Sequence, residues 1–160
     1  MTLYVLRHAR AGRRSAWKGA DEERPLSRVG RRQAVGIVDL LRGLDIAEIV
    51  TSPYLRCRES VEPLAERLGL PVDLADELAE GVDLQQILRL TDKVIDGNTV
   101  LCTHGDVMRL LLEHLRSEGV KVRRRNGAPL MEKGSMWVLE TRRGRVVKAT
   151  YQRPPRTSGS

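Results

Sequence analysis

Short apolar runs alternate along this chain with longer stretches in which apolar side chains recur every three or four positions. Brief continuous apolar runs are typical of strands buried on both faces, and the three-to-four spacing is typical of amphipathic helices. The runs at 2–6, 48–52 and 98–103 therefore predict buried strands. Because helical stretches separate them, we expect parallel strands joined by helical crossovers.

The helical periodicity predicts helices at residues 27–41, 54–68, 84–90 and 107–115, with a short strand at 71–74. Ser27 is a good N-cap for the first of these helices, because its hydroxyl oxygen can accept a hydrogen bond from a free N–H of the first turn. Pro63 lies inside the second helix, where its missing N–H predicts a kink or a break.

The last third of the chain has a different pattern. Residues 135–141 and 145–151 flank a turn and predict an antiparallel hairpin. Residues 154–160, rich in Pro, Ser and Gly, predict a disordered tail that follows a single domain over 1–153. The predicted fold is a three-layer α/β/α arrangement with a mixed, mainly parallel central sheet.

Polar side chains follow three of the predicted strands, at the point where each strand ends. Arg7 and His8 follow the first strand, Arg56 lies just beyond the second, and His104 follows the strand at 98–103. Since parallel neighbours end at the same edge of a sheet, we expect these side chains to converge on one crevice.

These residue types predict chemistry on a phosphoryl group. A neutral imidazole is a nucleophile near neutral pH, and a guanidinium matches two phosphoryl oxygens. The two histidines together with Asp106 offer an alternative, a zinc site. Arginines directed into the same crevice oppose a bound cation, so we expect neither a metal nor a cofactor.

Four sequence motifs together resemble those of the histidine phosphatase superfamily, whose fold is phosphoglycerate-mutase-like. They are Arg7-His8-Ala9, with alanine where glycine is usual, Leu26-Ser27-Arg28-Val29-Gly30, Ser52-Pro53-Tyr54-Leu55-Arg56 and Thr103-His104-Gly105. The short chain is most similar to the SixA-like phosphohistidine phosphatases. It also resembles the phosphatase-like domain that follows a Nudix domain in some two-domain hydrolases.

The resemblance implies that His8 attacks the phosphoryl group and that Arg7, Arg56 and His104 bind its oxygens. It also implies a proton donor for the leaving group. Because Leu78-Ala79-Glu80-Gly81 is similar to the family's acid segment, Glu80 is the first candidate for this role. Glu80 as a mere surface residue, Asp106 as the acid, or no acid at all remain alternatives at this stage.

The formal net charge of +7 adds a preference for anionic ligands. Arg10 and Arg13 follow His8 closely, and we expect them to attract or bind the substrate. The basic segment 121–125 is expected to be a solvated loop. We do not expect a nucleic-acid partner, because stacking platforms need aromatic residues, and this chain has only five Trp and Tyr and no Phe.

Location is predicted from what the sequence lacks. No apolar run approaches the ~20 residues of a membrane span, and the start of the chain lacks a signal peptide's pattern. Cys57 and Cys102 do not form a disulfide framework. We therefore expect a cytoplasmic protein with no membrane association.

Taken together, the sequence predicts a metal-independent phosphatase that forms a phosphohistidine at His8. Its expected substrate is a phosphorylated small molecule or a phosphoprotein, and a separately encoded Nudix protein is a possible partner. The alternatives are a phosphoglycerate-type mutase and a non-catalytic phosphate-binding module.

Overall fold

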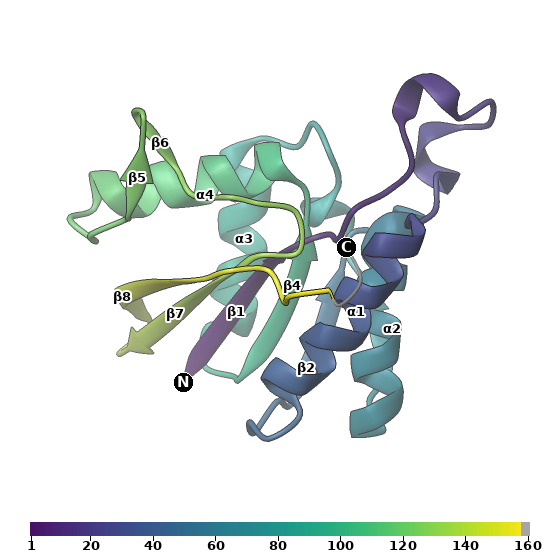
Figure 1. The fold of residues 1–160 in the computed structure, drawn as a ribbon. Helices are drawn as coiled ribbons and strands as arrows, with labels where there is room; N and C mark the ends of the chain where they lie inside the picture. Colours follow the sequence, from purple (N-terminus) through teal and green to yellow (C-terminus); the bar gives the residue numbers. More distant parts are fainter. Residues whose placement is uncertain (158–160) are drawn as a thin grey trace.

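The computed structural model describes residues 1–157 and places a six-stranded sheet at the centre of the molecule (Figure 1). The strand order is β3-β2-β4-β1-β7-β8. The strands are β1 (Thr2–Arg7), β2 (Glu48–Thr51), β3 (Val72–Leu74), β4 (Thr99–Thr103), β7 (Met136–Arg142) and β8 (Arg145–Gln152). The first four run parallel, and the β7–β8 hairpin adds an antiparallel edge beside β1. The predicted fold class is therefore confirmed.

Strands β1 and β4 form the middle of the sheet and fix the position of the catalytic candidates. Every residue of β4 is buried, and β1 pairs with it in parallel from Leu3 opposite Thr99 to Arg7 opposite Thr103. His8 and His104 each follow the last residue of these paired strands. This register therefore places both histidines at the same edge of the sheet.

Helices cover both faces of the sheet (Figure 1). Alternate residues of β1 point to opposite sides, so that Leu3 and Val5 join one core cluster and Tyr4 and Leu6 join the other. The first cluster contains the apolar faces of α3 (Leu84–Val94) and α4 (Gly105–Ser117), and the second contains those of α1 (Arg28–Leu41) and α2 (Leu55–Leu68).

The structure corrects several predicted boundaries. Helix α3 continues to Val94 rather than residue 90, and α4 begins at Gly105 and ends at Ser117. Helix α2 runs through Pro63 without a break, so the missing N–H costs one helical hydrogen bond but does not end the helix. The expected loop at 121–125 contains part of a small hairpin, β5 (Arg124–Arg125) and β6 (Ala128–Pro129).

Two further predictions concern the surface and the chain end. None of the helices in residues 1–157 has the length and apolar character needed to cross a membrane.

Of the predicted tail, residues 154–157 have no helix or strand and lie beside α1, and residues 158–160 fall outside the described part of the chain.

The loop after His8 is held against the start of α1. The Ser27 backbone N–H donates to the carbonyl oxygen of Arg10 at 2.9 Å, and the Ser27 side chain caps α1 by accepting from the Gly30 N–H. Gly30 leaves room for this arrangement, because a Cβ at residue 30 would overlap the same Arg10 carbonyl. The glycine of the Leu26–Gly30 motif thus sets how closely the loop approaches the helix.

We predict that Gly30→Ala lowers the free energy of unfolding by about 2–3 kcal/mol, because the methyl group forces the Arg10 loop away from α1. Gly43→Ala is the matched control, since a Cβ there meets nothing within 4 Å. The control is expected to be neutral or to stabilise by up to about 1 kcal/mol. Urea denaturation measures both changes, and equal stabilities would contradict the steric account.

Candidate active site

A cavity of about 410 Å³ lies at the edge of the sheet where β1 and β4 end. Its lining residues carry mainly charged side chains. They are Arg7, His8, Arg14, Arg24, Arg56, Glu80, Gly105, Asp106, Arg109, Met131 and Lys133. The convergence predicted for Arg7, His8 and Arg56 is therefore present, and Glu80 lines the same cavity.

Two backbone contacts fix the position and the tautomer of His8. Its N–H donates to the Thr103 carbonyl oxygen at 3.0 Å, which continues the β1–β4 pairing by one residue. Its Nδ1 lies 2.8 Å from the carbonyl oxygen of Ala9. Because a carbonyl oxygen only accepts, a neutral His8 carries its proton on Nδ1. The lone pair on Nε2 is then free.

The surroundings keep this imidazole neutral. Burial is the main reason that the pKa of His8 falls to about 3; the neighbouring His104, Arg56 and Arg7 act in the same direction, and the hydrogen bond to Ala9 opposes them. The side chain is only 6% exposed. His8 therefore needs no proton loss to act as a nucleophile at neutral pH.

Arg7 lies against the first turn of α4. Its Nη1 donates to the Met131 carbonyl oxygen at 2.5 Å. A Cβ at residue 105 would lie 2.8 Å from the Arg7 Cζ, so Gly105 gives the guanidinium its place. The glycine after His104 therefore makes room for the arginine before His8.

Arg56 is the most buried cation of the site, at 1% exposure. Its Nη1 and Nη2 donate to the backbone and the carboxylate of Asp21, at 2.8 and 3.0 Å, and its Cζ lies 4.9 Å from the ring centre of Tyr54. Burial acts to raise the pKa of Asp21, but hydrogen bonds from Arg24 and Arg56 outweigh it and lower that pKa. Asp21 therefore holds Arg56 as a stable ion pair.

His104 lies behind His8, with the two ring centres 5.4 Å apart and nearly edge to face. Its Nε2 is 2.9 Å from the Ser52 hydroxyl and 3.5 Å from the Cys57 sulfur. When the Ser52 hydroxyl donates to Nε2, the neutral His104 ring carries its proton on Nδ1. With this hydrogen bond from Ser52, a neutral His104 still has an N–H group, at Nδ1, that can donate to a ligand.

Three buried nitrogen atoms at the strand ends lack a hydrogen-bond partner within residues 1–157. They are Arg7 Nε, Arg56 Nε and His104 Nδ1. Buried donors are normally satisfied, and leaving one unpaired costs roughly 1–3 kcal/mol. A tetrahedral oxyanion beside His8 would supply acceptors to such a set of donors.

Ser60 connects the two halves of the site. Its hydroxyl donates to the Arg56 carbonyl oxygen at 2.6 Å and accepts the Ala9 N–H at 2.9 Å. The loop of the nucleophile and the helix that carries Arg56 are therefore joined through one buried side chain. Ser60 was not identified from the sequence, because a serine one helical turn after an arginine carries no distinctive signal.

Glu80 lies at the wall of the cavity beside two of its arginines. One carboxylate oxygen is 3.3 Å from Arg14 Nη2, and the other is 3.5 Å from Arg56 Nη2. Asp106 accepts the Gly81 N–H at 2.8 Å and so braces the loop that carries Glu80. Glu80 and Asp106, the two candidate acids, therefore both line the cavity. Asp106 also helps to hold Glu80 in position.

Two predicted substrate-binding residues lie elsewhere. Arg10 lines a neighbouring groove along α1, and Arg13 is exposed just before the short 3-10 helix Arg14–Ala16. In their place the cavity contains Arg24, Arg109 and Lys133. Asp21 and Arg24 lie in a loop whose conformation brings them to Arg56. A loop has no periodic sequence pattern, so the sequence did not reveal the role of these two residues.

Residues 1–157 contain no group of three or more His, Cys, Asp or Glu side chains arranged to hold a metal ion. The zinc alternative considered for His8, His104 and Asp106 therefore has no matching cluster in the described part of the chain.

The buried neutral His8 predicts a pH dependence of stability. Between pH about 3 and 6.5 the unfolded chain binds a proton at residue 8 that the folded protein does not, so the free energy of unfolding rises with pH in this window. Between pH 7 and 4.5 the wild type is expected to lose about 2 kcal/mol more than His8→Gln. Urea denaturation at both pH values tests this, and equal losses would mean an ordinary His8 pKa.

Residues 3–89, more than half of the chain, match the family model for the histidine phosphatase superfamily, branch 1. A curated relative, the 8-oxo-(d)GTP phosphatase of Mycolicibacterium smegmatis, is 36% identical over 161 residues. That match covers 96% of this chain and 48% of the relative, so the chain spans about half the length of this relative.

Two solved structures show the same fold. The protein histidine phosphatase SixA in complex with tungstate superposes with a TM-score of 0.73 at 18% identity, over 97% of this chain and 96% of that one. A mycobacterial glucosyl-3-phosphoglycerate phosphatase in complex with VO3 gives a TM-score of 0.73 at 19% identity, over 94% and 96%. Family model, fold and the clustered Arg7, His8, Arg56 and His104 agree: this chain belongs to the histidine phosphatase superfamily.

Proposed function

We propose that the protein is a metal-independent phosphatase that transfers a phosphoryl group to His8 Nε2 and then to water. The observation that carries this proposal is the state of His8: a buried, neutral imidazole with Nδ1 on the Ala9 carbonyl and Nε2 free beside two arginines. A group that only bound phosphate would gain more from a charged imidazolium than from a neutral one.

In the first step His8 Nε2 attacks phosphorus, and the bond from phosphorus to the leaving oxygen breaks as a phosphohistidine forms. Arg7, Arg56 and the Nδ1–H of His104 donate to the phosphoryl oxygens, which carry the charge of the transition state. In the second step water attacks phosphorus, the P–N bond breaks, and inorganic phosphate leaves. Fixed cations thereby take the place that a metal ion has in other phosphoryl-transfer sites.

Glu80 is the group we assign to proton transfer. It would donate a proton to the leaving oxygen in the first step and accept one from the attacking water in the second. Its position on the cavity wall beside Arg56 supports this role, and the hydrogen bond from Gly81 to Asp106 supports a positioning role for Asp106.

Hydrolysis is favoured over mutase activity by the open rim of the cavity. Arg14, Glu80, Asp106, Arg109 and Lys133 are all exposed, so water reaches the site. A mutase must protect its phosphohistidine from water, and these side chains offer no such cover. The cytoplasm remains the compartment in which we expect this activity.

The substrate is a phosphomonoester or a protein phosphohistidine. The 36%-identical relative acts on 8-oxo-(d)GTP, which makes a nucleoside phosphate a second candidate. A separately encoded Nudix protein is the partner we would test for nucleotide activity, because the sequence motifs also resemble the phosphatase-like domain that follows a Nudix domain in some two-domain hydrolases.

The central test is hydrolysis of p-nitrophenyl phosphate in the presence of EDTA. Wild-type turnover is expected to survive chelation, and His8→Ala is expected to lose at least about 1,000-fold in kcat, because the covalent route is removed. Circular dichroism checks that the variant is folded. Turnover of His8→Ala near the wild-type rate would exclude His8 as the nucleophile.

The role of Glu80 is tested by varying the leaving group. Glu80→Gln is expected to lower kcat/KM about 100-fold on an alkyl phosphate, whose leaving oxygen needs a proton, and less than about 10-fold on p-nitrophenyl phosphate. Glu77→Gln, at a nearby residue outside the cavity, serves as the control. Equal losses on both substrates would remove Glu80 from the acid role.

A further inference from the structure

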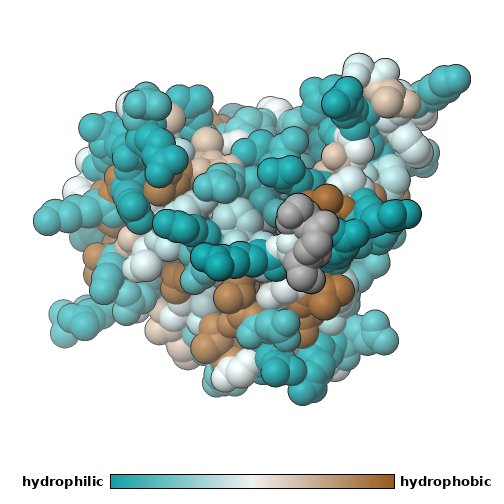
Figure 2. Space-filling view, viewed as in Figure 1, coloured by the Kyte–Doolittle hydropathy of each residue, from teal (hydrophilic) through white to brown (hydrophobic). Residues whose placement is uncertain are grey.

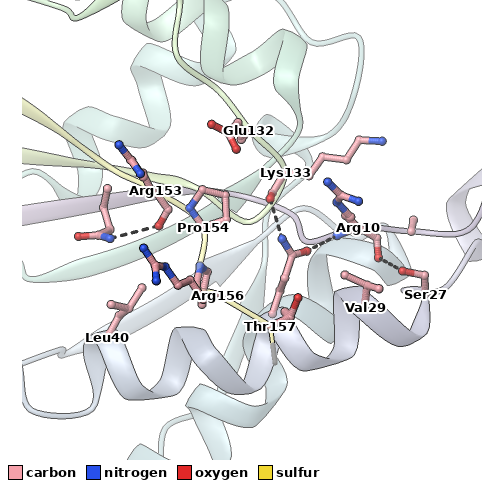
Figure 3. Close-up of a pocket in the computed structure, with 14 residues that line it drawn as sticks. Arg10, Ser27, Val29, Leu40, Glu132, Lys133, Arg153, Pro154, Arg156 and Thr157 are labelled. Atoms are coloured by element: carbon pink, nitrogen blue, oxygen red, sulfur yellow. Dashed lines mark hydrogen bonds between the residues drawn. The ribbon is translucent and has the colours of Figure 1, made fainter. Parts of the chain in front are cut away.

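A second and larger cavity adjoins the site, a groove of about 1290 Å³ between α1 and the segment that follows β8 (Figure 3). Its walls come from α1, the loop after His8, the loop before β7 and residues 152–157. The lining residues are Arg10, Ala11, Ser27, Val29, Gln33, Leu40, Glu132, Lys133, Gln152, Arg153, Pro154, Pro155, Arg156 and Thr157. Lys133 also lines the His8 cavity, so the two cavities share a wall.

A buried glutamine organises the end of the groove nearest His8. Gln33, on α1 and 5% exposed, accepts the Arg10 N–H at 2.9 Å and donates to the Lys133 carbonyl oxygen at 3.1 Å. Gly134 permits this contact, because a Cβ there would lie 2.9 Å from Gln33 Nε2. Gln33 therefore fixes the two loops that present Arg10 and Lys133 (Figure 3).

The other end is fixed by the C-terminal segment. Pro155 packs on Gly36 of α1 so closely that a Cβ at residue 36 would overlap its ring. Arg153 and Arg156, on either side of the two prolines, lie toward the Leu40 end of α1 (Figure 3). The groove therefore has cations at both ends and a partly apolar floor made by Val29, Leu40 and the prolines.

The charge in this groove is unbalanced. Within residues 1–157, Arg10, Lys133, Arg153 and Arg156 form no ion pair, and Glu132 is the one carboxylate among the lining residues. Burial lowers the pKa of Lys133, and the charges of Arg7, Arg24, Arg10 and Arg56 lower it further. Hydrophilic residues border the C-terminal segment on this face (Figure 2). The groove is thus complementary to an anion.

Its dimensions favour a chain over a small molecule. Small-molecule pockets usually have volumes of about 300–1,000 Å³, and the groove exceeds this range. From Val29 to Gly36, where Pro155 packs on the helix, α1 extends roughly 10 Å at about 1.5 Å per residue. An extended peptide spans that distance with about three residues.

A nucleotide fits the groove less well. Recognition of a base commonly uses an aromatic side chain for stacking, and none of the described lining residues is aromatic. Proline and aliphatic side chains, by contrast, suit the backbone and side-chain methylene groups of a peptide.

We propose that this groove binds an acidic peptide segment of a phosphoprotein substrate, with the phosphorylated residue in the His8 cavity and acidic side chains three or more residues away at Arg153 and Arg156. The proposal rests on the phosphatase function above and names its substrate class. In this proposal, Arg10 and Lys133 contact the part of the peptide between the phosphorylated residue and the acidic segment.

The test uses two synthetic phosphotyrosine peptides, one with four glutamates on each side at a distance of three to six residues and one with glutamines there. The wild type is expected to prefer the acidic peptide in kcat/KM. Arg153→Gln/Arg156→Gln is expected to reduce that preference about 5-fold, in the range expected for two exposed charge pairs, and raised salt is expected to reduce it as well.

The matched control is Arg67→Gln/Arg89→Gln. It removes two exposed arginines from α2 and α3, outside both cavities, and is expected to leave the preference intact. An equal loss in this control would show a general effect of net charge and would overturn the assignment of the groove. An unchanged preference in Arg153→Gln/Arg156→Gln would overturn it too.

Two additional measurements separate this proposal from the others. Fluorescence anisotropy of the labelled acidic peptide needs no turnover, so it tests the groove even if p-nitrophenyl phosphate hydrolysis fails and the phosphatase proposal falls. Titration with GTP tests the nucleotide alternative. Weaker GTP binding in Arg153→Gln/Arg156→Gln, with peptide binding unchanged, would contradict a peptide groove.

Discussion

The hydrogen bond between His8 Nδ1 and the Ala9 carbonyl oxygen is the interaction on which the site depends. Because the acceptor is a carbonyl, it assigns the proton to Nδ1 and leaves Nε2 as the free nucleophile. Burial and the nearby cations disfavour a second proton on the ring. The cations that would bind a phosphoryl group therefore also keep His8, the residue that accepts it, neutral and nucleophilic.

The rest of the fold maintains this arrangement. Parallel pairing of β1 with β4 brings His8 and His104 to one edge, and Ser60 connects the loop of His8 to the helix of Arg56. Asp21 partly neutralises Arg56, whereas the four basic residues of the groove along α1 form no ion pair within residues 1–157. In the proposed account the ion-paired Arg56 binds the phosphoryl group, and the cations of the groove bind the rest of the substrate.

The sequence predicted the sheet order only in outline, but it located Arg7, His8, Arg56 and His104 because each follows a strand of clear apolar character. Glu80 came from family resemblance and lies at the cavity, as expected. The sequence did not reveal Asp21, Arg24 and Ser60. The conformation of a loop places Asp21 and Arg24 at the site, and Ser60 lies one helical turn after Arg56, so none of the three belongs to a periodic pattern. Of the kink or break predicted at Pro63, the break is absent, because packing of α2 against the sheet outweighs one lost hydrogen bond.

The most direct test of the covalent account is to trap the phosphoenzyme in alkali during turnover and map the phosphoryl group. The account predicts a base-stable, acid-labile phosphohistidine on Nε2 of His8, which peptide mapping locates and NMR assigns to one ring nitrogen. A phosphoryl group on His104, or on Nδ1 of His8, would contradict the orientation set by the Ala9 carbonyl.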